Sequence, residues 1–447
     1  MYFLGVLVVA LGISVSIALH EVGHLIPAKK FGVKVTQYMV GFGPTIWSRR
    51  RGETEYGLKA VPLGGYIRMI GMFPPKPGAD PSILRGSSTG RFSQLMDQAR
   101  ADSMEQVKPG DEDRVFYKLS TPRKLVVMLG GPTVNLVIAV LLLGGIFTLF
   151  GVGEYTTRVS SVSRCVQTVP ASGTAPAACS PSDPQAPANL AGIRPGDRII
   201  SLAGHPVSSW DDVKTMVRPN GGRRIDVVVE RNGKRLTLAA TPILNEVPRV
   251  DAKGALVTGP GGKALTDRVG FMGFSPSAEI VRQPVLAVPA LIGSQIAGTA
   301  SVVFRIPQKM VGIAQAAFGD GERDPNGPMS VVGVGRVAGE VADGQLTGLA
   351  GTGSSKVVLL LSLIASLNLA LFVFNMIPLL PLDGGHAAGA LWEGLKRQVA
   401  RLRGRPNPGY VDVAKALPVA YGVSIALIGM SVLLIYADVV NPVKFGG

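Results

Sequence analysis

His20-Glu21-Val22-Gly23-His24 lies at the end of an uncharged apolar run that starts at Tyr2. On a helix, His-Glu-x-x-His places two imidazoles one turn apart on one face, with a carboxylate beside them. Two neutral imidazole nitrogens suit a tetrahedral zinc ion, and the adjacent Glu suits a general base that acts on water. A Glu and two His at bilayer depth are costly unless they perform chemistry. We therefore take His20 and His24 as candidate zinc ligands and Glu21 as the candidate catalytic base.

The composition predicts a membrane protein with sizeable parts outside the bilayer. Of the 447 residues, 47% are hydrophobic and 17% are charged, which is less charge than the usual quarter. Apolar segments long enough to span a bilayer occur at about 2–26, 125–150, 357–377 and 417–437. The first has no preceding basic residue and no following small-x-small site, so we expect no cleaved signal peptide.

Basic residues next to these segments set the expected orientation. Lys and Arg cluster at 29–34, at 118–124 and at 396–405, which the positive-inside rule assigns to the cytoplasm. Both termini and the stretch 151–355 then lie outside. The remaining positive charge (net +15 overall) is scattered, so membrane lipid is its expected partner and nucleic acid is not.

A catalytic zinc site with an open position needs a third protein ligand. In the run 375–385 (Asn-Met-Ile-Pro-Leu-Leu-Pro-Leu-Asp-Gly-Gly), Asp383 follows two helix-breaking prolines and precedes two glycines that allow a tight turn. Irregular backbone at membrane depth is tolerated where protein or a wet cavity satisfies it. The first and third segments both run inward, so Asp383 reaches the level of the two histidines. His386 is the competing ligand, and a polar position near the cytoplasmic surface is its alternative role.

The segment 284–304 tests this topology. It is apolar enough to be scored as a span, but it contains Ser294, Gln295, Thr299 and Ser301. If it crossed the membrane, the third segment would be inverted and Asp383 would lie about 30 Å from the histidines. We expect an interfacial amphipathic helix on the outer side instead.

Residues 33–70 predict a membrane-associated β-hairpin or small sheet. Tyr56, Leu58 and Ala60 alternate with polar residues, and Gly-Pro and Gly-Gly pairs punctuate the segment as turns. An edge of such a sheet can pair with an unwound substrate; the alternative is a ribbon that only packs under the helices.

Residues 71–122 show no clear periodicity and are expected to form a flexible cytoplasmic loop.

Residues 189–207 (Asn-Leu-Ala-Gly-Ile-Arg-Pro-Gly-Asp-Arg-Ile-Ile, then Ser-Leu-Ala-Gly-His-Pro-Val) resemble the PDZ signature, and Asn232-Gly233 between alternating runs predicts a hairpin. We expect a PDZ-like domain over 155–245, which either binds an extended peptide or acts as a size filter.

Cys165 and Cys179 lie in the outer stretch, so a disulfide is favoured over two free thiols.

Together these motifs resemble the site-2 protease family of intramembrane zinc metalloproteases, in its bacterial RseP-type branch with a PDZ domain. Residues 130–135 (Gly-Gly-Pro-Thr-Val-Asn) resemble a further element of that family's second span. The resemblance implies that His20, His24 and Asp383 bind Zn²⁺ and that Glu21 is the general base. It also implies that Asn375 binds substrate or stabilises the oxyanion, while capping of broken backbone is its alternative role.

The resemblance further implies a function and a location. The expected activity is the second cleavage in regulated intramembrane proteolysis, on single-span proteins such as anti-sigma factors that a site-1 protease has already trimmed. Remnant signal peptides are a further substrate class. The expected location is the bacterial cytoplasmic membrane, with the active site towards the cytoplasm. The main alternative is a PDZ-bearing membrane scaffold or receptor without protease activity; a metal transporter is disfavoured because no internal repeats are seen.

The expected fold is a polytopic α-helical membrane protein with four transmembrane helices, a membrane-associated β-hairpin or sheet, and an inserted α+β PDZ-like outer domain. Its expected parts are, in order, transmembrane helix 1 at 1–28, the β-hairpin region at 33–70, the cytoplasmic loop at 71–122, helix 2 at 123–150, the PDZ-like domain at 155–245, an outer accessory segment with an amphipathic helix at 246–355, helix 3 at 356–385, a cytoplasmic loop at 386–414 and helix 4 at 415–438.

Overall fold

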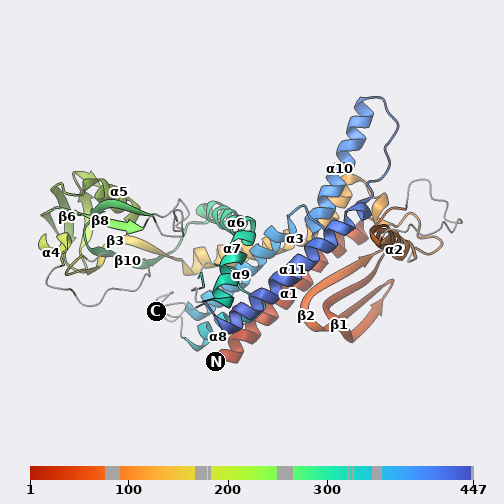
Figure 1. Cartoon of the computed structure of the whole chain (residues 1–447), viewed down its shortest axis with the longest axis horizontal. Coiled ribbons are helices and arrows are strands. Elements are labelled where there is room, and N and C mark those ends of the chain that lie inside the picture. The colour runs from red at the N-terminus through yellow and green to blue at the C-terminus, as the bar shows by residue number, and fades with distance from the viewer. Residues whose placement is uncertain are drawn as a thin grey trace. The chain divides into compact units, whose positions relative to one another are not determined.

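The computed structural model describes residues 1–75, 91–105, 107–166, 179, 183–248, 265–319, 323–324, 327–344 and 355–443. The chain forms two compact units. We call Met1–Phe150 with Gln283–Gly447 the helical unit, and Gly151–Arg282 the inserted unit. Figure 1 shows the elements of both.

The helical unit contains the long apolar helices. Its helical elements are α1 (Tyr2–Lys30), α2 (Arg91–Glu105), η1 (Phe116–Lys118), α3 (Thr121–Gly145), the π-helical turn η2 (Ile146–Phe150), η4 (Val285–Ala287), α6 (Val288–Phe304), α7 (Ile306–Phe318), α8 (Val331–Asp343), α9 (Ser355–Asn375), α10 (Asp383–Leu402), η6 (Val413–Ala416) and α11 (Leu417–Val440). In the described residues, five helical stretches are long and apolar enough to cross a membrane: Tyr2–Lys30, Thr121–Phe150, Val285–Phe304, Lys356–Asn375 and Val413–Val440. The chain is thus a multi-pass membrane protein, and Val285–Phe304 is a fifth candidate beside the four expected spans.

Contacts fix the relative direction of α1 and α9. Val9 packs in one cluster with Leu360, and the Asn368 side chain donates a hydrogen bond to Ser16 Oγ at 2.9 Å. Residue numbers rise in the same direction along both helices at these contacts, so α1 and α9 are parallel. If α1 and α9 both cross the membrane, one crossing back by α3 between them gives this parallel arrangement. One further crossing by α6 alone would reverse α9. This geometry favours an interfacial α6, while the number of spans stays a prediction.

Strands β1 (Val35–Arg51) and β2 (Thr54–Met69) form a sheet beside α1 (Figure 1). Residues 37–40 of β1 lie between two parts of β2, because they pair with 65–68 on one side and with 55–58 on the other. The stretch 65–69 therefore lies at an edge. The Tyr38 hydroxyl donates to the Ala18 carbonyl of α1 at 2.8 Å, which holds the sheet against the helix.

Two expected loops contain helices. Within 71–122, of which 76–90 and 106 lie outside the described residues, the structure has α2. Its Arg100 forms a local ion pair with Asp97 at 2.7 Å and a tertiary ion pair with Asp412 at 2.5 Å, and these support a helix that lacks apolar periodicity. Within 386–414 the structure has α10, which buries small residues such as Ala387 and Ala390 against its neighbours.

The inserted unit is an α+β domain. Its elements are β3 (Val152–Val162), α4 (Pro187–Leu190), β4 (Arg198–Leu202), β5 (His205–Pro206), α5 (Trp210–Val217), η3 (Arg218–Asn220), β6 (Ile225–Arg231), β7 (Lys234–Ala240), β8 (Ile243–Pro248), β9 (Thr266–Phe271) and β10 (Phe274–Val281). The main sheet has the order β10-β3-β4-β6-β7, with β5 paired to β4, while β8 and β9 form a separate pair. The expected Asn232-Gly233 turn joins β6 and β7, with φ of 51° and 75°.

The domain extends further than the expected 155–245. Strand β10 pairs with β3, and Met272 belongs to the buried core with Ile199, Leu202 and Val227. In the sequence, the interval 249–264, outside the described residues, separates β9 and β10 from the PDZ-like motif, so the motif gives no sign that the domain continues to β10.

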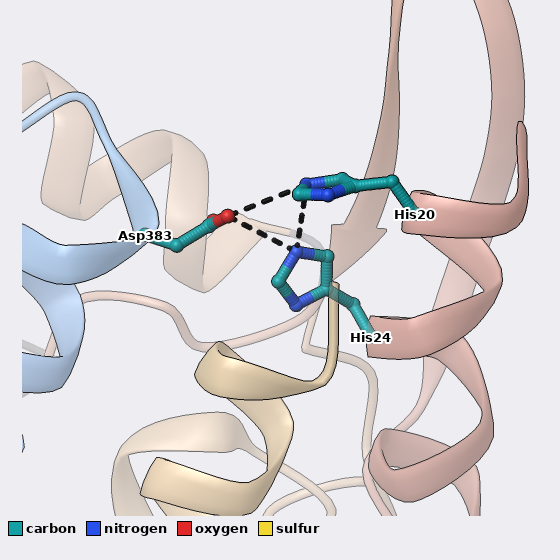
Figure 2. Close-up of side chains that lie close together, drawn as sticks. All are labelled: His20, His24 and Asp383. Atoms are coloured by element: carbon teal, nitrogen blue, oxygen red, sulfur yellow. Dashed lines mark hydrogen bonds and ion pairs between the residues drawn. The ribbon is translucent and has the colours of Figure 1, made fainter. Parts of the chain in front are cut away.

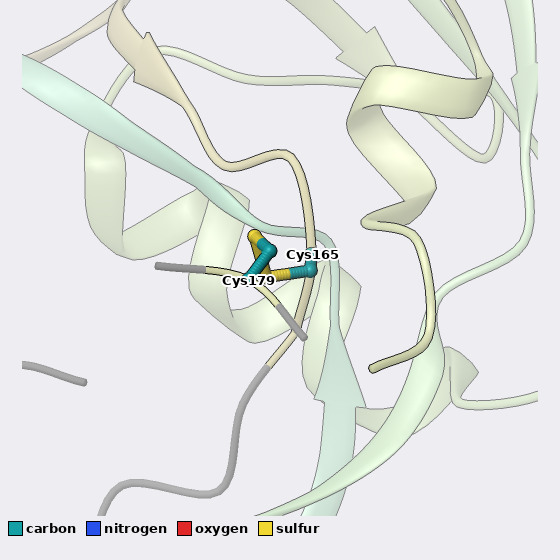
Figure 3. Close-up of a disulfide and its surroundings, with 2 residues drawn as sticks. All are labelled: Cys165 and Cys179. Atoms are coloured by element: carbon teal, nitrogen blue, oxygen red, sulfur yellow. A yellow bond between two sulfur atoms is a disulfide. The ribbon is translucent and has the colours of Figure 1, made fainter. Parts of the chain in front are cut away.

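Cys165 and Cys179 form a disulfide in this unit, with an S–S distance of 1.98 Å and a Cα–Cα distance of 6.0 Å (Figure 3). The bridge closes a loop whose inner residues, 167–178, lie outside the described part of the chain.

Candidate metal centre

Three side chains from two helices converge in the helical unit. His20 and His24 project from the same face of α1, and Asp383 is the first residue of α10 (Figure 2). The backbone before Asp383 turns through Pro378 and Pro381, so the chain leaves α9 and presents the carboxylate to the imidazoles. Among the described residues, His20, His24 and Asp383 form the group of His, Cys and acidic side chains whose ligand atoms lie close enough together to hold a metal ion.

The distances fit a tetrahedral ion. The two Nε2 atoms lie 3.2 Å apart, and Asp383 Oδ2 lies 3.3 Å from each of them. Two ligands at tetrahedral angles with bonds of about 2.0–2.1 Å are separated by about 3.3 Å. Asp383 Oδ2 is buried and has no hydrogen-bond partner, as expected for an oxygen reserved for a cation.

The outer nitrogens of both imidazoles are held by α3. His24 Nδ1 lies 2.7 Å from the Val127 carbonyl oxygen, which only accepts, so Nδ1 carries the proton and Nε2 offers a lone pair. His20 Nδ1 lies 3.0 Å from the Asn135 amide, whose buried Oδ1 has no partner. We infer that this amide is turned so that Oδ1 accepts from His20 Nδ1–H. Both Nε2 lone pairs then face Asp383, an arrangement that repels unless a cation lies between them.

Glycines let α3 approach α1 closely enough to do this. A Cβ on Gly23 would lie 2.5 Å from the Gly130 carbonyl oxygen, so the two backbones touch. A Cβ on Gly131 would collide with the imidazoles of His24 and His20. Gly23 of α1 and the pair Gly130-Gly131 of α3 thus allow the same close contact between the two helices.

Glu21 lies beside this group and against the edge of the β sheet. It is 8% exposed, and its Cγ would touch a Cβ placed on Gly65 at 3.0 Å. A buried carboxylate next to three converging ligands is suitably placed to exchange a proton with a water molecule there.

The other candidate residues lie apart from the ligand group. Asn375 is the last residue of α9; it is half-buried, and its side chain makes no hydrogen bond with the described part of the chain. His386 lies one turn beyond Asp383 and lines a small pocket with Lys124 and Glu393, outside the group. The sequence placed Asn135 only in an element that resembles the family's second span, and its contact with His20 was not predicted. The spacing of Gly130-Gly131 and Asn135 was the available signal.

Comparison with known proteins decides the family. Residues 8–418 match peptidase family M50. The chain belongs to peptidase family M50. The zinc metalloprotease Rip1 of Mycobacterium tuberculosis H37Rv is 34% identical over 452 residues, covering 99% of each chain. The Rip1 protein of Mycolicibacterium smegmatis is 32% identical over 461 residues, again with 99% coverage of each chain. Metalloprotease MmpA of Caulobacter vibrioides is 26% identical over 407 residues, 87% of this chain and 86% of that one.

Membership of this family confirms the resemblance to site-2 proteases. With zinc metalloproteases as its full-length relatives, the chain is a zinc metalloendopeptidase, and Zn²⁺ is its cofactor. The donor set of two neutral imidazoles and one carboxylate fits that ion. A scaffold without protease activity is therefore the weaker interpretation of the sequence.

Proposed function

We propose that this M50 peptidase cuts single-span membrane proteins within the bilayer, as the second protease in regulated intramembrane proteolysis. Anti-sigma factors trimmed by a site-1 protease are the expected substrate class. The observation that supports this proposal is the convergence of His20 and His24, on the apolar helix α1, with Asp383, which follows the apolar helix α9, while Glu21 lies beside them. The proposed location is the bacterial cytoplasmic membrane, with the inserted unit outside and the active site towards the cytoplasm.

The proposed roles follow from the contacts. His20, His24 and Asp383 hold Zn²⁺, while Val127 and Asn135 keep both imidazoles in the metal-binding tautomer. Bound zinc supplies Lewis acidity, which polarises the scissile carbonyl and lowers the pKa of water. Glu21 takes the proton of the attacking water and later delivers it to the leaving amine.

The edge stretch 65–69 is proposed to present the substrate. A transmembrane helix hides its peptide groups in internal hydrogen bonds, so it must unwind before attack. Strand 65–69 pairs with 35–40 on one side only, and its Gly65 touches Glu21. An unwound substrate segment that adds to this edge would have its peptide bond next to the catalytic carboxylate. Asn375, whose side chain at the end of α9 makes no hydrogen bond within the described residues, is proposed to contact the same segment.

The inserted unit is proposed to bind peptide. Beside α5 lies a pocket of about 210 Å³, lined by the apolar side chains of Trp210, Val213, Val217, Met272 and Phe274. Strand β10 is an edge strand of the main sheet, so an extended peptide could add to it. This favours a binding groove over a pure size filter.

Cleavage of matched substrates tests the proposed place in the sequence of cuts. A tagged single-span protein would be presented to purified enzyme with and without its outer domain, together with Glu21→Ala enzyme as the control. We expect the trimmed substrate to be cut within its span and the intact one to be cut much more slowly. Equal cutting of both would refute the second-cut role, while leaving the peptidase assignment in place.

A further inference from the structure

A polar pocket opens on the β1–β2 sheet, away from the metal centre. Its volume is about 530 Å³, and its lining includes Lys34, Gln37, Arg50, Glu55, Arg68 and Lys108. The register places four of these side by side across the sheet, because Gln37 pairs with both Arg68 and Glu55, and Arg50 pairs with Glu55. Directly paired residues point to the same face, so these four side chains form one polar row.

Positive charge exceeds negative charge in this pocket. Lys34 is paired with Asp111 at 2.5 Å, and the two charges cancel. Arg50, Arg68 and Lys108 make no ion pair with any residue of the described chain, and Glu55 offers one negative charge against these three. Two positive charges are therefore left over, which suits an anionic ligand.

Exposed apolar side chains lie further along the same sheet, where strand alternation puts Trp47 and its partner Leu58 on the face opposite the polar row. Phe42, Ile46, Trp47, Leu58 and Val61 are between 44% and 72% exposed. The change from apolar to basic occurs within one strand, between Trp47 and the three arginines at 49–51. Tryptophan at such a boundary is typical of the level where acyl chains meet headgroups.

We propose that this pocket binds the phosphate headgroup of an anionic phospholipid, whose acyl chains lie at the level of the exposed apolar side chains further along the sheet. Arg50 and Arg68 flank the row and supply the bidentate donors that a phosphate oxygen pair accepts, and Lys108 adds a point charge. A free phosphate would satisfy the cations alone. The change from apolar to basic side chains along the strand places these cations at the headgroup level and commits the site to a lipid, and the site does not depend on proteolysis.

Trp47 provides a direct probe. The full chain, with Trp210→Phe and Trp392→Phe, would be placed in nanodiscs of phosphatidylcholine with a small fraction of phosphatidylglycerol. Bromine on the acyl chains of one lipid or the other quenches Trp47 according to local enrichment. We expect brominated phosphatidylglycerol to be enriched about fivefold near Trp47. Arg50→Gln with Arg68→Gln should bring the ratio close to one.

The control variant removes the same charge elsewhere. Arg401 and Arg403 are exposed at the end of α10, so Arg401→Gln with Arg403→Gln should keep the enrichment. Equal quenching by both lipids in the starting chain would overturn the proposal. An equal loss of enrichment in both double variants would also overturn it, because the enrichment would then depend on the net charge of the protein and not on this pocket. Loss of enrichment on adding millimolar inorganic phosphate at constant ionic strength would assign the pocket to free phosphate and also overturn the lipid assignment.

Discussion

At the scale of single residues, the metal centre depends on the absence of side chains as well as on their presence. Gly131 lies where a methyl group would collide with His24 and His20. We predict that Gly131→Ala lowers zinc affinity about 10- to 100-fold, because it displaces the ligands from their positions. Competition with a chelator measures this. Gly145→Ala in the same helix, where a Cβ meets nothing within 4 Å, should leave affinity unchanged.

The residues of the centre were predictable where helix periodicity decides the geometry. His20 and His24 share a face because they are four positions apart, and the proline-broken run after α9 marked Asp383. The partners of the outer nitrogens, Val127 and Asn135, depend on the register between α1 and α3. The Gly130-Gly131 pair signals a close approach of α3 but does not by itself fix that register, so these contacts became visible only in the structure.

At the scale of elements, a buried ion pair holds α3 to α10. Lys124 Nζ contacts both carboxylate oxygens of Glu393 at 2.9 Å, and these side chains are 6% and 3% exposed. Glu393→Ala leaves Lys124 buried without its partner, so we predict a loss of about 3 kcal/mol in stability. Thermal unfolding in detergent measures it.

An apolar replacement of both partners provides the comparison for Glu393→Ala. Lys124→Met with Glu393→Leu should recover most of the loss, because neither charge is then left buried alone. If the single variant were as stable as the starting chain, the pair would not be holding α10 in place.

In the inserted unit, an acidic side chain links β6 to the turn before β4. Burial alone would raise the pKa of Asp197, but hydrogen bonds from the Arg231 guanidinium and the Arg194 main-chain amide outweigh it and hold the pKa below its ordinary value. A lowered pKa in the folded state stabilises above the ordinary carboxyl pKa, and this contribution is lost as pH falls below about 4.

We therefore predict that the denaturant midpoint of this unit falls as pH is lowered through that range. The probe is Trp210 fluorescence in a chain carrying Trp47→Phe and Trp392→Phe. Asp197→Asn should start less stable at neutral pH and show a smaller change with acid. An identical pH dependence in both chains would contradict the role given to Asp197.

Elements were predictable unevenly for a physical reason. The Asn232-Gly233 hairpin and the apolar helices carry local signals, and so does α5, whose Ser209 and Asp212 form a capping box. By contrast, α2 depends on the ion pair between Arg100 and Asp412, 312 residues apart in the chain. Such a helix cannot be derived from its own periodicity.

At the scale of the whole molecule, the parallel α1 and α9 require that α6 does not add a single crossing. Single cysteines at exposed sites test this, since the native pair is in a disulfide. We predict that an impermeant maleimide labels Asp211→Cys and Gln308→Cys in intact cells, and Asn407→Cys only after permeabilisation. Labelling of Gln308→Cys only after permeabilisation would show that α6 spans the membrane.

The apolar helices of a multi-pass membrane protein were predictable from hydropathy, whereas the extent of the inserted unit was not. Strands β9 and β10 follow a stretch without signature, and only their pairing and the burial of Met272 assign them to this unit. Hydropathy also leaves open whether the protein has four or five membrane segments, because α6 is apolar enough to span. A crossing by α6 is disfavoured by the direction of α9, which depends on its contacts with α1.

The most direct test of the central claim is to measure bound zinc and cleavage side by side in wild type, Glu21→Ala and Asp383→Asn. The substrate is a tagged single-span protein without its outer domain. We predict that Glu21→Ala keeps its zinc and loses at least about 100-fold in cleavage, because only the proton transfer is removed. Asp383→Asn should lose zinc and cleavage together. Cleavage by Glu21→Ala at the wild-type rate, or full zinc occupancy in Asp383→Asn, would contradict the roles assigned to these residues.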